Sequence, residues 1–176
     1  MYNALTRGAE AELFPALKRY GLAFYAYNPL AAGLFSGKYS SVTDDPDEGR
    51  FSTKVDSVRA QRYRERYFQP AIFAALAVVE PVAKEEGLTL VAVAIRWLVH
   101  HSALQIADGG PDGLILGVSS LAQLEQNLDA MEAGPLPESV VKALDEAWRV
   151  AKPEAADYWI GNLEYEYDTK KALFST

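Results

Sequence analysis

Apolar residues recur at the spacing of an α-helix along much of the chain. Leu13, Leu17 and Tyr20 follow one another at four- and three-residue intervals, which predicts a helix from Thr6 to Tyr20 with Thr6 capping its first turn. Gly21 would end this helix, because glycine readily adopts the left-handed conformation of a helix C-terminus. Similar patterns predict further helices at residues 58–67, 70–86, 89–100, 121–131 and 138–151.

Two short apolar runs have the length and composition of buried strands. The first, residues 22–27, ends at the turn signal Asn28-Pro29, and the second, residues 114–118, follows a glycine-rich approach. Apolar strands that alternate with helices favour parallel βαβ units. Parallel sheets normally contain more than two strands, so these two alone would leave open edges of unpaired backbone groups. The pattern therefore indicates part of a larger α/β fold.

Composition and charge narrow the classes of partner. The chain has 176 residues, of which 49% are hydrophobic and 23% charged, as in one globular domain. Its net charge of −7 disfavours nucleic acid and anionic membranes as partners, although a local basic cluster can still bind a small anion. The absence of cysteine excludes thiolate catalysis and thiolate metal sites, and no metal site is predicted. With neither a membrane span of about 18 apolar residues nor a secretory signal, cytoplasmic localisation is expected.

The first stretch that suggests chemistry follows the first predicted strand. Tyr27, Asn28 and Pro29 lie at the carboxyl end of that strand, where ligands bind in parallel α/β folds. The ring of Tyr27 can stack on a heteroaromatic ligand, small residues up to Gly37 let backbone N–H groups approach a phosphate, and Lys38 adds charge. The connection over residues 31–58 is also unusually long for a loop without function. An ordinary glycine-containing loop with a surface lysine is the alternative.

The second stretch follows the second predicted strand. Ser119 and Ser120 stand before a helix, and the free N–H groups and dipole of a helix N-terminus attract anions. Gln123 and Asn127 lie one turn apart on one helix face, so both could reach one adenosine phosphate. The alternative is a serine-capped helix with solvated polar residues.

A third stretch pairs a phenol with a guanidinium. Tyr63 and Arg66 are three residues apart on a predicted helix and are expected to face the same side. Together they would suit a substrate carboxylate or carbonyl. A solvated charged helix face is the alternative.

Taken in order, these stretches resemble the aldo-keto reductases, and most closely their aflatoxin-aldehyde reductase subfamily. The resemblance rests on Tyr-Asn-Pro-Leu-Ala-x-Gly-Leu-x-x-Gly-Lys-Tyr at 27–39, Gly-Arg-Phe at 49–51, Tyr-Arg-x-Arg at 63–66 and Gly-x-Ser-Ser-Leu-x-Gln-Leu-x-Gln-Asn at 117–127. It covers residues 1–160, which are expected to form a partial barrel domain, and leaves residues 161–176 as an unmatched tail.

The resemblance implies a fold and a cofactor. The fold would be an α/β one, the C-terminal part of a (β/α)₈ TIM barrel from the end of the sixth strand to the eighth strand and the last helices. The cofactor would be NADPH/NADP⁺, with its nicotinamide on Tyr27, its pyrophosphate along residues 28–38 and its 2′-phosphate end near Arg50 and the start of the helix at 121. The implied cofactor residues are Tyr27, Asn28, Pro29, Leu30, Gly33, Gly37, Lys38, Arg50, Gly117, Ser119, Ser120, Gln123, Gln126 and Asn127.

The resemblance also implies an activity, the reduction of small aldehydes and ketones to alcohols, with Tyr63 and Arg66 at the substrate. The family's catalytic Asp, Tyr, Lys and His come from the first half of the barrel, and no residue here matches them. His100 and His101 are expected to be helix-end residues. The chain is thus expected to carry the half that binds the cofactor phosphates and to be inactive alone. The alternatives are a non-catalytic remnant, a regulatory module that binds a nucleotide or partner chain, and a fragment that aggregates or forms homo-oligomers through exposed barrel edges.

Overall fold

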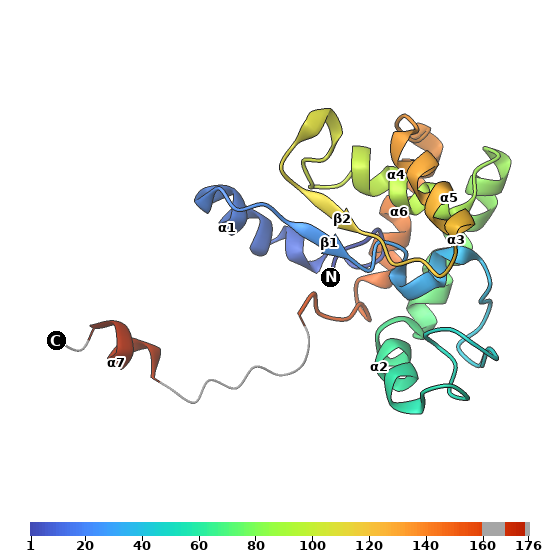
Figure 1. Ribbon diagram of the computed structural model, residues 1–176, viewed down its shortest axis with the longest axis horizontal. Helices are drawn as coiled ribbons and strands as arrows, with labels where there is room; N and C mark the ends of the chain where they lie inside the picture. The colour runs from blue at the N-terminus through green and yellow to red at the C-terminus, as the bar shows by residue number, and fades with distance from the viewer. Residues whose placement is uncertain (160–167, 175–176) are drawn as a thin grey trace.

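The fold is built around two short parallel strands that lie side by side. The computed structural model describes residues 1–159 and 168–174. In it β1 (Tyr25–Tyr27) pairs with β2 (Gly113–Ile115), and the pair lies at the centre of Figure 1. The strands run parallel and helices connect them, so the predicted βαβ connection is confirmed.

The helices of the second half agree with the predicted ranges to within one residue at either end. α2 (Ser57–Tyr67), α3 (Pro70–Glu85) and α4 (Leu90–His100) form the crossover between the strands. α5 (Leu121–Glu132) and α6 (Glu138–Ala151) follow β2.

The residue at the start of a helix explains why several helices begin where they do. Asp56, Thr89 and Ser120 precede α2, α4 and α5, and each side chain accepts a hydrogen bond from the backbone N–H three residues on. α3 begins instead with Pro70, whose missing N–H has no helical partner to lose in the first turn.

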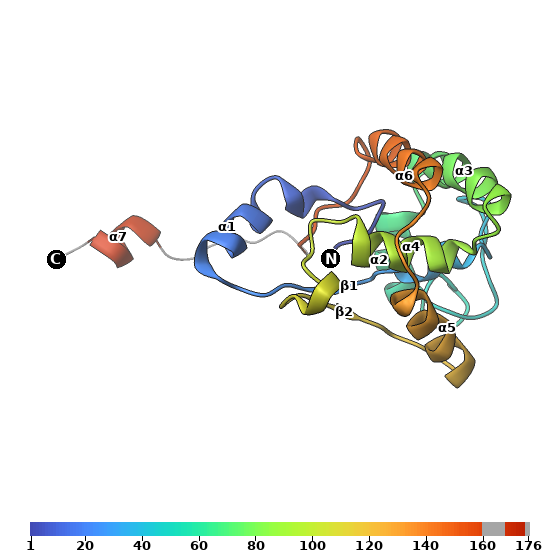
Figure 2. The ribbon, with the colours of Figure 1, turned by 90° about the horizontal axis from the view of Figure 1, so that it is seen from above.

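The hydrophobic core lies among the helices and against one face of the strands. α3 and α6 lie side by side in both views (Figures 1 and 2). α4 is apolar on nearly every side because its neighbours enclose it, and its Trp97 is the largest of the fully buried side chains. Other fully buried core residues on these helices are Ile72, Val79, Val93, Leu98, Val140 and Leu144.

The N-terminal segment differs from the prediction. Helix α1 spans only Leu13–Tyr20, after a short 3₁₀ turn at Gly8–Glu10, and Thr6 does not cap it. The Thr6 hydroxyl instead donates to Asn3 Oδ1 at 2.7 Å within a buried turn. Pro15 explains the late start, because proline has no backbone N–H and is tolerated only in the first turn of a helix.

One face of the strand pair is open, so the prediction of fully buried strands is wrong. Tyr25 is 62% and Ile115 54% exposed, whereas Ala26 on the opposite face is fully buried. Figure 2 shows α3, α4 and α6 on one side of the strands only. The Tyr25 ring lies over Gly113, where an added Cβ would come within 2.8 Å of it. Among the described residues neither strand has a second strand partner, as predicted, although the Tyr2 N–H donates to the Tyr27 carbonyl at the outer edge of β1.

The predicted tail at 161–176, with its boundary at residue 160, lies largely outside the described residues. Residues 168–174 contain the short helix α7 (Thr169–Phe174). None of the helices in the described ranges is long and apolar enough to cross a membrane.

Candidate functional site

The two predicted phosphate-binding stretches line one cleft. Since β1 and β2 are parallel neighbours, with Tyr27 opposite Ile115, their carboxyl ends meet at the same edge of the sheet. A cleft of about 740 Å³ opens there, between the segment after β1, the segment after β2 and the start of α5. Of the predicted site residues it is lined by Tyr27, Asn28, Pro29, Leu30, Gly33, Lys38, Arg50, Tyr63, Gly117, Ser119, Gln123, Gln126 and Asn127.

Three predicted residues do not line the cleft. Gly37 ends the 3₁₀ segment η2 (Ala31–Ser36) with a φ of 72°, and Ser120 uses its hydroxyl to cap α5. Arg66 does not line the cleft, whereas Tyr63, three residues earlier on α2, does. The pKa of the Met1 amine is lowered to about 5, first because the amine is partly buried and second because the positive charge of Arg66 is near it. Arg66 therefore lies near that end of the chain.

Sequence reasoning missed part of the wall. Thr89, Leu90 and Val91 at the start of α4 line the cleft because the crossover brings them there, and no local motif signals it. Tyr39 also lines the cleft and directly follows Lys38, so the motif itself could have included it. Burial, followed by the nearby Glu48 charge, raises the pKa of Tyr39, so its phenol stays protonated and can donate a hydrogen bond.

The backbone is strained where it leaves β1. Asn28, Ala31 and Ala32 have φ values of 58°, 48° and 60°, in the left-handed region that non-glycine residues rarely occupy. Each such residue costs about 1 kcal/mol or more, and this strain collects at ligand sites. The Asn3 side chain stabilises the first of these turns by donating from Nδ2 to the Asn28 carbonyl at 3.0 Å.

Asn28 has a buried donor without a hydrogen-bond partner among the described residues. Its Oδ1 accepts a hydrogen bond from Arg50 Nη1 at 3.3 Å, but its Nδ2 is buried without a partner in the part of the chain that the structure describes. An unsatisfied buried donor costs about 1–3 kcal/mol. Burial raises the pKa of the Tyr67 phenol and the Asn3 and Asn28 side chains oppose this, so the Asn28 amide faces that hydroxyl as well as lining the cleft.

Arg50 stands between the two strand ends. Besides its bond to Asn28, its guanidinium carbon lies 5.4 Å from the centre of the Tyr63 ring. On the other side, its Nη2 lies 3.1 Å from the point where a Cβ on Gly117 would be. A side chain larger than glycine at residue 117 would therefore crowd the guanidinium.

The charge of the cleft is opposite to that of the chain. Lys38 and Arg50 line it, and the described lining contains no aspartate or glutamate, although the chain carries a net charge of −7. Two cations in a concave wall raise the local concentration of anions. The arrangement suits a ligand with more than one negative group.

At the start of α5 a side chain already occupies the anion donors. Gln123 Oε1 accepts hydrogen bonds from Ser119 N at 2.9 Å and from Ser119 Oγ at 3.0 Å. A phosphate that used these donors would have to displace the Gln123 amide. One turn further, Asn127 lines the cleft at 3% exposure and makes no hydrogen bond within the described residues, so its amide is available to a ligand in the cleft.

Comparisons with known proteins agree with this geometry. The aldo/keto reductase family model matches residues 1–149. The chain is 42% identical to an aldo-keto reductase of Pseudocercospora fijiensis over 90% of this chain and 52% of that protein. It is 46% identical to human aflatoxin B1 aldehyde reductase member 2 over 90% of this chain and 45% of that protein. The chain thus spans about half the length of the curated relatives it matches.

A solved structure shows the same fold. The glycerol dehydrogenase AKR11B4 from Gluconobacter oxydans superposes with a TM-score of 0.59 and 22% sequence identity, over 92% of this chain and 44% of that chain. The predicted fold class, part of a (β/α)₈ barrel, is confirmed. The chain belongs to the aldo/keto reductase family, and its curated relatives include aflatoxin B1 aldehyde reductases.

Proposed function

We propose that the chain holds the phosphate groups of NADPH in an oxidoreductase that reduces aldehydes and ketones to alcohols. One observation carries the proposal: the cleft combines two cations, no described carboxylate and two asparagines with unused hydrogen-bonding capacity, Asn28 and Asn127. This set of donors fits a polyanionic dinucleotide better than a neutral ligand.

Each wall of the cleft has its own role in the proposal. Tyr27 would stack on the nicotinamide, and the strained turn after Asn28 would hold the pyrophosphate together with Lys38, using Pro29, Leu30, Gly33 and Gly37 as its backbone. The 2′-phosphate end would lie at Arg50 and Ser119, beside Gly117, Gln123, Gln126 and Asn127, with Ser120 supporting the helix start. Tyr63 and Arg66 would contact the carbonyl substrate.

When bound, NADPH supplies the hydride for the carbonyl carbon. The residues of this chain would fix the cofactor and turn one face of its ring toward the substrate. The described lining of the cleft contains no aspartate or histidine, so the proton-donor set of the family is not assembled there. General acid catalysis is worth roughly 10²–10⁴-fold, and the 176-residue chain by itself is expected to show negligible turnover.

Titration of the purified chain tests the proposal. Intrinsic fluorescence should change on addition of NADPH, and NADH should bind more weakly because it lacks the 2′-phosphate. Arg50→Ala should remove most of this difference. Equal binding of the two nucleotides would contradict the roles of Arg50 and Gln123, and clear consumption of NADPH with 4-nitrobenzaldehyde would contradict the expected inactivity.

A partner-binding role has separate support. The open face of the strand pair exposes Tyr25 and Ile115, and the outer edge of β2 has no strand partner among the described residues. Exposed strand edges pair readily with other chains. Sedimentation velocity at increasing concentration should therefore reveal self-association, and a monomer at all concentrations would argue against this role.

A further inference from the structure

Arg64 connects the cleft-forming loop to helix α2. Its Nη1 donates to the carbonyl oxygen of Asp44 at 2.7 Å and to that of Phe51 at 3.2 Å, and its Nη2 donates to the carbonyl oxygen of Val42 at 3.1 Å. The loop, residues 38–56, descends beside α2 at the lower right of Figure 1. One guanidinium thus holds both limbs of the loop.

Aromatic packing fixes the guanidinium itself. Its central carbon lies 4.3 Å from the centre of the Phe68 ring, and Phe68 packs on the fully buried Phe51 with ring centres 4.5 Å apart. Tyr39, at the other end of the loop, packs edge-on against Phe51 at 5.1 Å. The loop is therefore anchored in the core from below while Arg64 holds its backbone.

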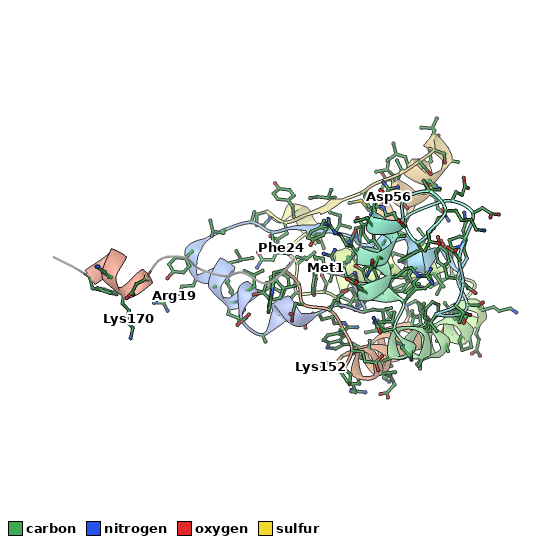
Figure 3. All side chains as sticks on the ribbon, turned by 90° about the horizontal axis from the view of Figure 1, so that it is seen from below. Met1, Arg19, Phe24, Asp56, Lys152 and Lys170 are labelled. Carbon is green, nitrogen blue, oxygen red and sulfur yellow. The ribbon has the colours of Figure 1, made fainter. Side chains whose placement is uncertain are left out.

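Several other polar contacts of the loop are made within it, besides the bond from Arg50 to Asn28. Asp44 accepts from Ser40 and Ser41, and Asp45 accepts from Thr53. The bonds of Asp44 and Asp45 shape the loop without tying it to helix α2. In the described part of the chain, every hydrogen bond between residues 38–53 and α2, whose beginning Asp56 marks in Figure 3, comes from Arg64.

The carbonyl that Arg64 holds at Phe51 belongs to the residue after Arg50. Holding this point limits where the Arg50 backbone can be, and so where its guanidinium can reach between Asn28 and Gly117. A lysine at position 64 would keep the charge, but its single nitrogen lacks the planar fork that reaches three separate carbonyls.

We propose that Arg64 is a positioning residue for recognition of the nucleotide 2′-phosphate, acting through Arg50. The inference rests on the proposed function, and it adds Arg64 as a residue that contributes to the preference for NADPH over NADH. Arg64 orders the loop before the ligand arrives, so binding does not have to supply that ordering.

Arg64→Lys tests the proposal, with Arg62→Lys as the matched control on the exposed side of the same helix. Arg64→Lys should weaken NADPH binding about three- to tenfold, the cost of ordering a side chain and its loop. NADH binding should change little. Amides in residues 42–52 should exchange hydrogen faster without nucleotide, while the control leaves both measurements unchanged.

A double variant separates positioning from general stability. In the Arg50→Ala background, Arg64→Lys should no longer alter the ratio of NADH to NADPH dissociation constants. An equal loss of affinity for both nucleotides, or a ratio that still falls in the double variant, would overturn the positioning role alone. Absence of NADPH binding by the unchanged chain would overturn the proposed function and this inference with it.

Discussion

Replacement of Arg7 by alanine should destabilise the whole chain. The Arg7 side chain is 8% exposed and makes three hydrogen bonds: Nε to the Ala4 carbonyl at 2.9 Å, Nη1 to Asp145 Oδ1 at 2.8 Å, and Nη2 to the Leu144 carbonyl at 2.9 Å. Its guanidinium carbon also lies 4.2 Å from the centre of the Trp97 ring. Arg7 therefore joins the N-terminal segment, α4 and α6.

The magnitude follows from what the substitution leaves behind. Removing one partner of a buried ion pair costs about 3–5 kcal/mol, but Asp145 is 48% exposed and can recover hydration. The two carbonyls lose a charged donor, at roughly 1 kcal/mol each or more, and the Trp97 face loses a cation–π contact worth about 1 kcal/mol. The sum is about 3 kcal/mol, a large part of the 5–15 kcal/mol that typically stabilises a folded domain.

Urea denaturation followed by tryptophan fluorescence measures this loss. Arg149→Ala is the matched control, because Arg149 forms an exposed pair with Glu146 on α6, and such pairs contribute at most about 1 kcal/mol. Arg7→Lys should fall between the two, since lysine keeps the charge without the fork. A loss below about 1 kcal/mol for Arg7→Ala, equal to that of the control, would refute the reasoning.

Two further substitutions test the cleft and the pH dependence. Gln123→Glu should weaken the binding of NADPH and of inorganic phosphate. The new carboxylate would still accept the hydrogen bonds from Ser119 N and Oγ, and its negative charge would repel an anion. Unchanged binding curves for both ligands would contradict this prediction. His101 Nε2 accepts a hydrogen bond from Leu136 N at 2.8 Å, so its ring is neutral there, and burial, followed by the charges of His100 and Arg96, lowers its pKa below the ordinary 6.5. A group whose pKa is lowered in the folded state contributes its full stability above pH 6.5 and less as the pH falls. The urea midpoint of unfolding should therefore decrease as the pH falls below 6.5, and this decrease should be smaller in His101→Gln.

The sequence predicted those elements whose signals are local. α6 begins and ends where its apolar spacing indicates, and the hydroxyl of Ser120 sets the start of α5. The predicted start of α1 was wrong because the Thr6 hydroxyl bonds to Asn3 in a buried turn, and a side-chain contact of this kind competes with helix capping. The exposure of Tyr25 also could not be predicted, since it depends on which elements cover the strand.

In the candidate site, too, the sequence reveals the residues that lie in local motifs and not those that only the folded chain brings together. Its strand ends, glycines and cations lie in motifs that the sequence displays, and the structure gathers them in one cleft. The part played by Leu90 could not be found in the same way, because the crossover alone brings the start of α4 to the cleft. The contacts of Arg64 were equally hidden, since backbone carbonyls of an irregular loop leave no pattern in the sequence.

The strongest argument for a ligand in this cleft lies in what its residues lack. Asn28 and Asn127 are separated by most of the chain, yet both are buried at the cleft, and neither the Asn28 Nδ2 nor the Asn127 amide has a hydrogen-bond partner among the described residues. An asparagine kept for stability alone would be expected to satisfy its amide within the protein, as Asn3 does with four neighbours. Asn28, Arg50 and Asn127 line the same cleft, so one elongated ligand could bond to all three side chains. Contacts with the same ligand would offset the strain of the turn at Asn28, and such strained backbone is expected at a binding site.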